Sequence, residues 1–322
     1  LHGCNSQPSP RDTAEIIIAT TGNNIISFPV DITIGVMDTS AIRRISGDST
    51  QINIPIDIEV NNENKLFILS QGHSNVPAKV LIFSDSATGN AAPERVIDVT
   101  GDSGFKPIGL TITTRTDFIY VSYFSQDTSR NQKIVRFPIG SGIRAQFEFS
   151  MPSLGDIEMD PSGQFIHSVD PLGKKLIKFR VSSNFDIQPG FDIIQGSNTG
   201  LRVPNSIALT NDGTIYVFDK EESGINGRIN IYGPNSIGNT APVRVTWGFC
   251  PGNKRFITPY GLTVAEHTGI KVIAACDAQG VTTFLESSVL SDSTGCTNFI
   301  QQLDLREFGD PIAVTWERVK FQ

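Results

Sequence analysis

The stretch that decides the fold of this chain is Pro204-Asn205-Ser206-Ile207-Ala208-Leu209-Thr210-Asn211-Asp212-Gly213-Thr214-Ile215-Tyr216-Val217-Phe218-Asp219. An apolar segment entered through Pro-Asn is followed by an Asn-Asp-Gly turn and by a second segment rich in β-branched and aromatic residues. Two such segments around a glycine-containing turn predict a β-hairpin. Related hairpins recur along the chain, so the sequence describes a repeat.

The first segment of this hairpin occurs six times along the chain. Equivalent positions in them are Asp57, Gly109, Asp156, Ser206, Gly261 and Ala313, separated by steps of 52, 47, 50, 55 and 52 residues. A period near 50 with strands throughout is typical of propeller blades. Each repeat holds two further strands, as at residues 79–85 and 94–100, which makes four antiparallel strands per blade.

The two ends of the chain complete one blade between them. Residues 15–47 contain three strands without an opening strand, and residues 310–322 supply an opening strand without its partners. We therefore expect the C-terminal strand to lie innermost beside the N-terminal strands and to close the ring, which removes exposed sheet edges. The prediction is an all-β, six-bladed β-propeller in one domain over residues 15–322. Its blades are residues 15–47 plus 310–322, 54–101, 106–150, 153–197, 203–248 and 258–305.

Charge argues against a nucleic-acid partner, and hydropathy argues against a membrane-spanning helix. The 322 residues carry a net charge of −7, and the longest basic cluster is Lys174-Lys175. Nucleic-acid binding needs a concentrated cationic face, so no nucleic-acid partner is expected. No apolar run approaches the roughly 20 residues of a membrane-spanning helix.

The first residues, Leu1-His2-Gly3-Cys4, resemble the lipobox of bacterial lipoproteins, in which the cysteine becomes the acylated N-terminus. Residues 5–10 are polar and rich in proline, as a tether would be. We expect residues 1–14 to be a signal-peptide remnant and flexible tether, with lipid attachment at Cys4. The expected location is the bacterial outer membrane or cell surface, with a periplasmic or secreted protein as the alternative.

The repeat resembles a known group at its most regular positions. Pro-x-Gly/Ser-Ile/Leu-x-Val followed by a turn and Ile-Tyr-Val-x-Asp is similar to the NHL repeat. The segments at residues 87–97 and 236–245 are similar to the Gly-Asn-x-Ala-Pro-x-Arg insert of bacterial surface NHL-like proteins. The resemblance covers nearly the whole chain after residue 14, and it implies the fold rather than a function, because this fold hosts hydrolases, lyases and binding scaffolds.

Known enzymes of this fold have site residues that can be compared with this chain. Six-bladed lactonases hold a divalent cation at the channel mouth with carboxylate and Asn oxygens, partly from Pro-Asn-Gly and Pro-Asp-Gly openings. Only Asn205 provides such an oxygen at the position after the proline. A hard cation needs several oxygen ligands. The four histidines lie in unrelated places. We therefore expect no catalytic residue, no cofactor and no metal.

Aspartates at the ends of second strands occupy equivalent places in three blades: Asp170, Asp219 and Asp277. The simpler interpretation is that each accepts backbone N–H bonds in the turn that follows it. The alternative is that they ring the channel mouth with Asn205 and Tyr260 as a ligand-binding face.

Four cysteines and the absence of Cys-x-x-Cys favour an exported protein over a metal site. We predict a Cys250–Cys276 disulfide, with Cys296 free or, if Cys4 is not acylated, paired with Cys4. Four cysteines allow three full pairings, and the sequence alone does not choose among them. The leading functional hypothesis is a non-enzymatic, lipid-anchored propeller that binds a protein or a surface polymer. The alternative is a metal-dependent hydrolase of the lactonase or gluconolactonase type. A sugar-binding propeller would need aromatic platforms, and Tyr123 and Tyr260 are too few to predict one.

Overall fold

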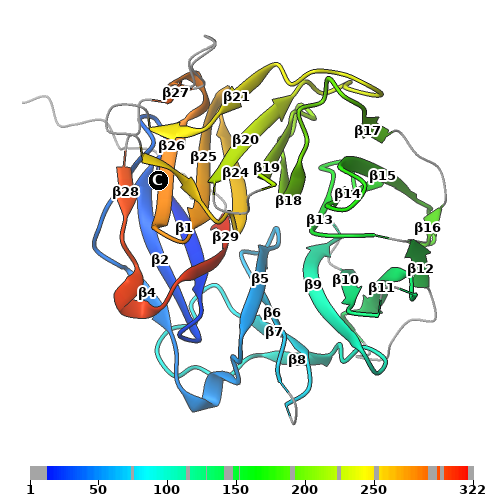
Figure 1. Cartoon of the computed structure of the whole chain (residues 1–322). Helices are drawn as coiled ribbons and strands as arrows, with labels where there is room; N and C mark the ends of the chain where they lie inside the picture. Colours follow the sequence, from blue (N-terminus) through cyan, green and yellow to red (C-terminus); the bar gives the residue numbers. More distant parts are fainter. Residues whose placement is uncertain are drawn as a thin grey trace, which may run out of the picture.

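Strand pairing in the computed structural model follows the sequence repeat, and Figure 1 shows six sheets arranged around a central axis. The structure describes residues 13–73, 76–113, 117–127, 129–140, 148–151, 153–188, 193–222, 226–249, 254–288, 296–297 and 301–317. The prediction of an all-β, six-bladed propeller is confirmed. The helices in this described part are short 3-10 turns at Asp48–Thr50, Glu286–Ser288 and Arg306–Phe308, and none could cross a membrane.

The first three blades are built in the order expected from the sequence. Blade 1 contains β29 (Pro311–Glu317), β1 (Thr13–Thr20), β2 (Asn24–Asp31), β3 (Val36–Met37) and β4 (Arg43–Ile45). Blade 2 contains β5 (Pro55–Val60), β6 (Leu66–Ser70), β7 (Lys79–Phe83) and β8 (Arg95–Asp98). Blade 3 contains β9 (Phe105–Ile112), β10 (Phe118–Ser125), β11 (Gln132–Pro138) and β12 (Glu148–Met151).

Of the last three blades, blades 4 and 5 include additional short strands. Blade 4 contains β13 (Ile157–Met159), β14 (Phe165–Asp170), β15 (Lys175–Val181), β16 (Ile187–Gln188) and β17 (Ile193–Gln195). Blade 5 contains β18 (Val203–Leu209), β19 (Ile215–Lys220), β20 (Asn226–Tyr232) and β21 (Arg244–Thr246), extended by β23 (Lys254–Ile257), β22 (Gly248–Phe249) and β27 (Cys296–Thr297). Blade 6 contains β24 (Gly261–His267), β25 (Ile270–Asp277), β26 (Gly280–Leu285) and β28 (Gln301–Leu303).

The ring closes in blade 1, as the sequence predicted. β29 pairs with β1 in antiparallel register, with Trp316 opposite Ile16 and Ala313 opposite Ala19. Next to this pairing, the carbonyl oxygen of Phe308 accepts hydrogen bonds from Thr20 Oγ1 at 2.7 Å and from Asn24 Nδ2 at 2.9 Å. The two ends of the chain are thereby joined by backbone and side-chain hydrogen bonds.

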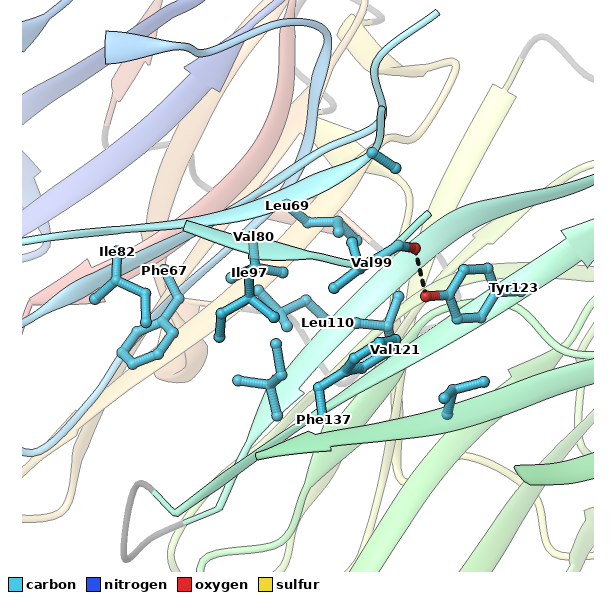
Figure 2. Packing of buried hydrophobic residues seen from close by; sticks show 13 residues of the cluster. Phe67, Leu69, Val80, Ile82, Ile97, Val99, Leu110, Val121, Tyr123 and Phe137 are labelled. Atoms are coloured by element: carbon cyan, nitrogen blue, oxygen red, sulfur yellow. Dashed lines mark hydrogen bonds between the residues drawn. The ribbon is translucent and has the colours of Figure 1, made fainter. Parts of the chain in front are cut away.

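Apolar side chains fill the space between neighbouring blades. Figure 2 shows the cluster between blades 2 and 3, where Phe67 and Val80 lie near Leu110 and Phe137. The ring of Tyr123 is buried in the same cluster, and its hydroxyl donates to the carbonyl of Val99 at 2.7 Å. The period-2 alternation of the strands supplies one face to each neighbour, so both faces of a blade read as apolar.

The Gly-Asn-x-Ala-Pro-x-Arg segments connect blades to one another. In blade 2, Asn90 Oδ1 accepts a hydrogen bond from the backbone N–H of Ser49 at 2.8 Å, in the link that follows blade 1. The same segment ends at Arg95, whose Nη1 donates to the carbonyl of Ile139 in blade 3. The insert at residues 87–95 therefore contacts the blade before it and the blade after it.

The second insert, at residues 236–244, repeats this arrangement. Asn239 Oδ1 accepts from the backbone N–H of Asn198 after blade 4, also at 2.8 Å, and Arg244 Nη1 donates to the Glu286 carbonyl of blade 6 at 3.3 Å. We call the two inserts the interblade clasps. One joins blades 1, 2 and 3, and the other joins blades 4, 5 and 6.

Candidate functional site

A β-bulge follows the proline of four opening strands. Pro55 and Asp57 pair with consecutive residues of β6, so Ile56 between them is unpaired, and the same irregularity occurs at Ile108, Asn205 and Ile312. In a bulge, the side chain of the extra residue points in a different direction from the one that the regular strand alternation would give it. All four bulge residues line the cavity in the centre of the ring.

This cavity, the central channel, has a volume of about 350 Å³, and both apolar and polar side chains line it. Phe124, at the end of a second strand, is 38% exposed. We define the channel mouth as six apolar or aromatic residues that line the channel: the bulge residues Ile56, Ile108 and Ile312, the residues Phe124 and Pro171 at the ends of second strands, and Tyr260 directly before β24. The other five are partly exposed, and apolar groups gathered around a hollow mark a binding surface more often than scattered ones do.

Four carboxyl groups line the same channel. They belong to an Asp-Ile-Glu triplet that occurs twice, as Asp57-Ile58-Glu59 on β5 and Asp156-Ile157-Glu158 at the start of β13. Residues two apart on a strand point to the same side, so each triplet presents both carboxyls to the channel. The isoleucine between them is buried between blades.

The two aspartates bind the neighbouring blade. Asp57 Oδ2 accepts a hydrogen bond from the backbone N–H of Leu110 at 2.6 Å. Asp156 Oδ2 accepts from Ser206 Oγ at 2.8 Å and from the N–H of Ile207 at 3.1 Å. Each aspartate therefore fixes one opening strand beside the next around the channel.

The two glutamates interact with each other, and a hydrogen bond joins their carboxyl groups. Burial raises the pKa of Glu158 to about 8, helped by the negative charges of Asp156 and Asp57. Burial also raises the pKa of Glu59 well above its ordinary value, with the nearby Glu158 adding to the effect. Two acids in contact cannot both ionise cheaply, so the contact favours keeping a proton on the pair.

Burial also raises the pKa values of the two aspartates. Burial is the main cause that raises the pKa of Asp57, followed by repulsion from Asp156 and Glu59. Burial raises the pKa of Asp156 to about 6, and its hydrogen bonds to Ile207 and Ser206 oppose that rise. No lysine, arginine or histidine is among the described residues that line the channel. The channel is consequently acidic without a compensating cation of its own.

Asn205 is held by the neighbouring blade. Its Nδ2 donates to the carbonyl oxygens of Pro259 at 3.1 Å and Tyr260 at 2.9 Å. Its side chain and Tyr260 both line the channel, so the structure brings these two predicted residues together. In the part of the chain that the structure describes, no three His, Cys, Asp or Glu side chains are grouped to hold a metal ion.

The three strand-end aspartates are buried, and none is among the residues that line the channel. Asp170 accepts from the N–H of Gly173 at 2.7 Å, and Asp277 accepts from Gln279 and Ile257, both at 2.8 Å. Their hydrogen bonds fix turns and links beside the opening strands.

Asp219 forms the largest of these networks. It accepts backbone N–H bonds from Arg202 and Val203 at 2.9 Å and pairs with Arg228 Nε at 3.1 Å. The Arg228 guanidinium lies over the ring of Trp247, 4.9 Å from its centroid. Asp219 therefore ties the link before β18 to β20.

Cys276 has a free, buried thiol, which differs from the predicted Cys250–Cys276 disulfide. Its Sγ points into the core, where it accepts a hydrogen bond from the N–H of Gly261 at 3.1 Å, rather than toward the link. The prediction placed Cys276 by the end of its strand and overlooked which face it occupies. Cys4 and Cys250 lie outside the described residues, so the structure does not bear on lipid attachment.

The four channel carboxyls are functional candidates that the sequence reading missed. The sequence carries a signal for them, because Asp57 and Asp156 occupy equivalent positions of the repeat and both are followed by Ile-Glu. The position after the proline, by contrast, carries an oxygen ligand only at Asn205.

No protein-family model and no curated protein sequence matches the chain. Solved structures do match it over nearly its whole length. A nidogen/laminin complex aligns with a TM-score of 0.60 and 10% identity over 95% of this chain and 98% of the other. The Pseudomonas aeruginosa periplasmic gluconolactonase PpgL aligns with a TM-score of 0.60 and 11% identity over 96% and 100%.

A third structure, a putative 6-phosphogluconolactonase from Bacteroides uniformis, aligns with a TM-score of 0.58 and 14% identity over 95% and 99% of the two chains. At such identities the similarity shows the propeller fold alone. The fold class is thus supported independently of the sequence repeat, while proteins with different roles share it.

Proposed function

We propose that this propeller is a non-enzymatic binding module that holds a partner protein over the channel mouth, with a primary ammonium group of the partner, such as a lysine side chain, entering the channel. The observation that carries the proposal is one channel lined both by the apolar and aromatic side chains of the channel mouth and by four carboxyl groups, with no cation among the described lining residues. A lysine matches both parts, because its methylene stem is apolar and its ammonium group is charged. Charge complementarity then selects the partner.

The channel carboxyls also set a condition for binding. Burial and mutual repulsion favour protonated carboxyls in the channel. An entering ammonium group favours their ionised form, since an opposite charge nearby lowers a carboxyl pKa. Binding should therefore release protons and strengthen as pH rises from 6 to 8.

A peptide probe tests this proposal. We would titrate the protein with an acetylated, amidated Leu-Lys-Leu peptide and with the same peptide carrying Nε-acetyl-lysine, and follow binding by calorimetry. The lysine peptide should bind and the acetylated one should not. Glu158→Gln and Phe124→Ala should each weaken binding by about tenfold or more, in line with loss of a charge partner or an aromatic anchor.

Ile237→Ala is the matched control, because Ile237 is 58% exposed but does not line the channel. It should leave the affinity unchanged. Equal binding of the acetylated peptide would overturn the proposal, because the charge would then have no role.

The lactonase alternative rests on the fold shared with gluconolactonases and on the acidic channel. Its test is a bound-metal analysis combined with a lactone and ester hydrolysis screen. A stoichiometric cation together with turnover that Asn205→Ala abolishes would favour this alternative over the binding module.

The location of the molecule belongs to the same proposal. Surface exposure through a lipid on Cys4 would place the channel mouth where it meets partner proteins. Mass spectrometry of the protein from native membranes should find Cys4 as an acylated N-terminus. An unmodified Cys4 within an uncleaved chain would remove the anchor from the proposal and leave the binding site in place.

A further inference from the structure

A second hollow lies between blades 1 and 2, outside the channel. This groove, of about 600 Å³, is lined by the β1–β2 hairpin, by the link after β4 and by the start of β7. Its polar side chains include Asn23, Arg44, Gln51 and Lys79. It shares no residue with the lining of the channel, so it is a separate site.

Two cations face this groove without a carboxylate partner among the described residues. The guanidinium of Arg44 donates from Nε and Nη2 to Asn24 Oδ1, at 3.0 and 2.7 Å, and lies 5.3 Å from the centroid of the Phe308 ring. Lys79 Nζ donates to Gln51 Oε1 at 3.0 Å. Amide oxygens hold both groups in place and leave their charge uncompensated, in a chain whose net charge is −7.

The amide groups of the groove are turned so that their donors remain available. Asn23 Oδ1 accepts from the backbone N–H of Ile54 at 2.8 Å, and Gln51 Oε1 accepts from Lys79. Because the oxygens are occupied, the NH₂ groups of these side chains are left to donate. The groove is therefore rich in donors and carries two positive charges against one lining carboxylate, Asp48.

The backbone of this wall is held in unusual conformations. Asn23 has a φ of 57°, Gln51 of 58° and Ile54 of 51°, and a positive φ is rare for a β-branched residue. The hydrogen bond from Ile54 to Asn23 stabilises two of these residues together.

We propose that this groove binds an acidic sugar, a uronic acid unit of a carbohydrate, whose carboxylate pairs with Arg44 and Lys79 and whose hydroxyls accept hydrogen bonds from Asn23 and Gln51. A guanidinium held by its Nε side still offers Nη1 to a carboxylate. Neighbouring hydroxyls match amide donors, so charge and hydrogen bonding act together without an aromatic platform. This site is independent of the ammonium site in the channel.

Trigalacturonate and its methyl ester test the proposal, because the two probes have the same hydroxyls and differ in charge. Calorimetry or ligand-observed NMR should show trigalacturonate binding at least about tenfold more tightly than the ester, which is the factor expected from a charge-assisted pair of about 1.4 kcal/mol. Lys79→Gln should reduce the affinity for the acid and leave binding of the ester unaffected. Raising the salt concentration should weaken binding of the acid.

Asp48→Asn is the matched variant on the same wall. It removes the opposing negative charge, so the affinity for trigalacturonate should rise or stay the same. Arg44→Lys keeps the charge but loses the bond geometry to Asn24, and it should bind more weakly than the natural protein.

Equal binding of acid and ester, or no binding of either, would overturn the proposal. Inorganic phosphate that binds as tightly as trigalacturonate would also overturn it, because the groove would then recognise an anion and not a sugar. A lysine peptide that binds normally to the Lys79→Gln variant would show that the channel site is intact.

Discussion

Asn90 Oδ1 accepts a hydrogen bond from the backbone N–H of Ser49, 41 residues earlier in the chain and in the link between two blades. Asn239 and Asn198 repeat the contact with the same separation of 41 residues. A glycine faces each asparagine, because a Cβ at Gly47 or Gly196 would lie within 2.6 Å of the amide oxygen. The Gly-Asn inserts therefore join blades, which gives this recurrent motif a structural role.

We expect Asn90→Ala and Asn239→Ala each to lower the free energy of unfolding by about 1 kcal/mol, the net contribution of one hydrogen bond, and more if the N–H left behind stays buried. Urea denaturation followed by tryptophan fluorescence measures the effect. Asn235→Ala, an exposed position in the same blade, is the control and should be neutral within about 0.5 kcal/mol. Equal stability of all three variants would mean that the clasps contribute nothing.

Removing the carboxylate of Asp219 should be much more costly. Asp219 and Arg228 form a buried ion pair, with side-chain exposures of 0% for Asp219 and 8% for Arg228. Asp219→Ala leaves the Arg228 charge without its partner, and breaking a buried pair costs about 3–5 kcal/mol. Thermal or urea unfolding should show this loss.

Asp170→Ala is a suitable comparison for Asp219→Ala. Asp170 occupies the same strand-end position, but its Lys175 partner is 3.5 Å away and half-buried. Its loss should cost about 1 kcal/mol, close to one hydrogen bond to a backbone N–H. If Asp219→Ala costs no more than Asp170→Ala, the network around Arg228 is not a stabilising element.

Most of the fold can be predicted from the repeat period. Proline-entered strands about 50 residues apart, together with strands missing at one end and supplied at the other, determine a six-bladed closed ring. The short strands β22, β23 and β27 escaped prediction because they lie in irregular links and pair by tertiary contact instead of following a period.

The binding candidates were harder to predict than the fold. Periodicity places Asp57 and Glu59 on one side of a strand, but it does not reveal that Glu59 and Glu158, from blades 2 and 4, meet in the channel. The groove between blades 1 and 2 depends on Arg44 and Lys79, which are 35 residues apart in sequence and share no motif. Such sites arise from the packing of blades, which a single sequence does not show.

Cys276 should be unreactive toward thiol reagents in the native protein. Its side chain is fully buried, and burial raises the pKa of the thiol far above its ordinary value, so little thiolate forms at neutral pH. Peptide mapping after alkylation should find Cys276 unmodified in native protein and fully modified in urea. A disulfide-linked peptide containing Cys276 under non-reducing conditions would contradict the structure.

Stability should fall as pH rises from about 5 to 8. An unfolded aspartate or glutamate titrates near a pKa of about 4, whereas in the fold the pKa is about 6 for Asp156 and about 8 for Glu158. Between those values the folded state binds more protons than the unfolded state, so the stabilising effect is complete below the unfolded pKa and is lost as pH rises through the folded values. Burial also raises the pKa of Asp277 to about 6, so it contributes over the lower part of this range.

Glu158→Gln isolates the contribution of the channel to this pH dependence. Glutamine keeps the size and a hydrogen bond to Glu59 but does not titrate, so the loss of stability between pH 6 and 8 should become smaller. Asp277 is unchanged in this variant, and the part of the decline below pH 6 should remain. Urea denaturation at pH 5, 6, 7 and 8 gives both curves. Parallel curves for the variant and the natural protein would show that Glu158 is ionised in the folded channel and that the glutamates share no proton there.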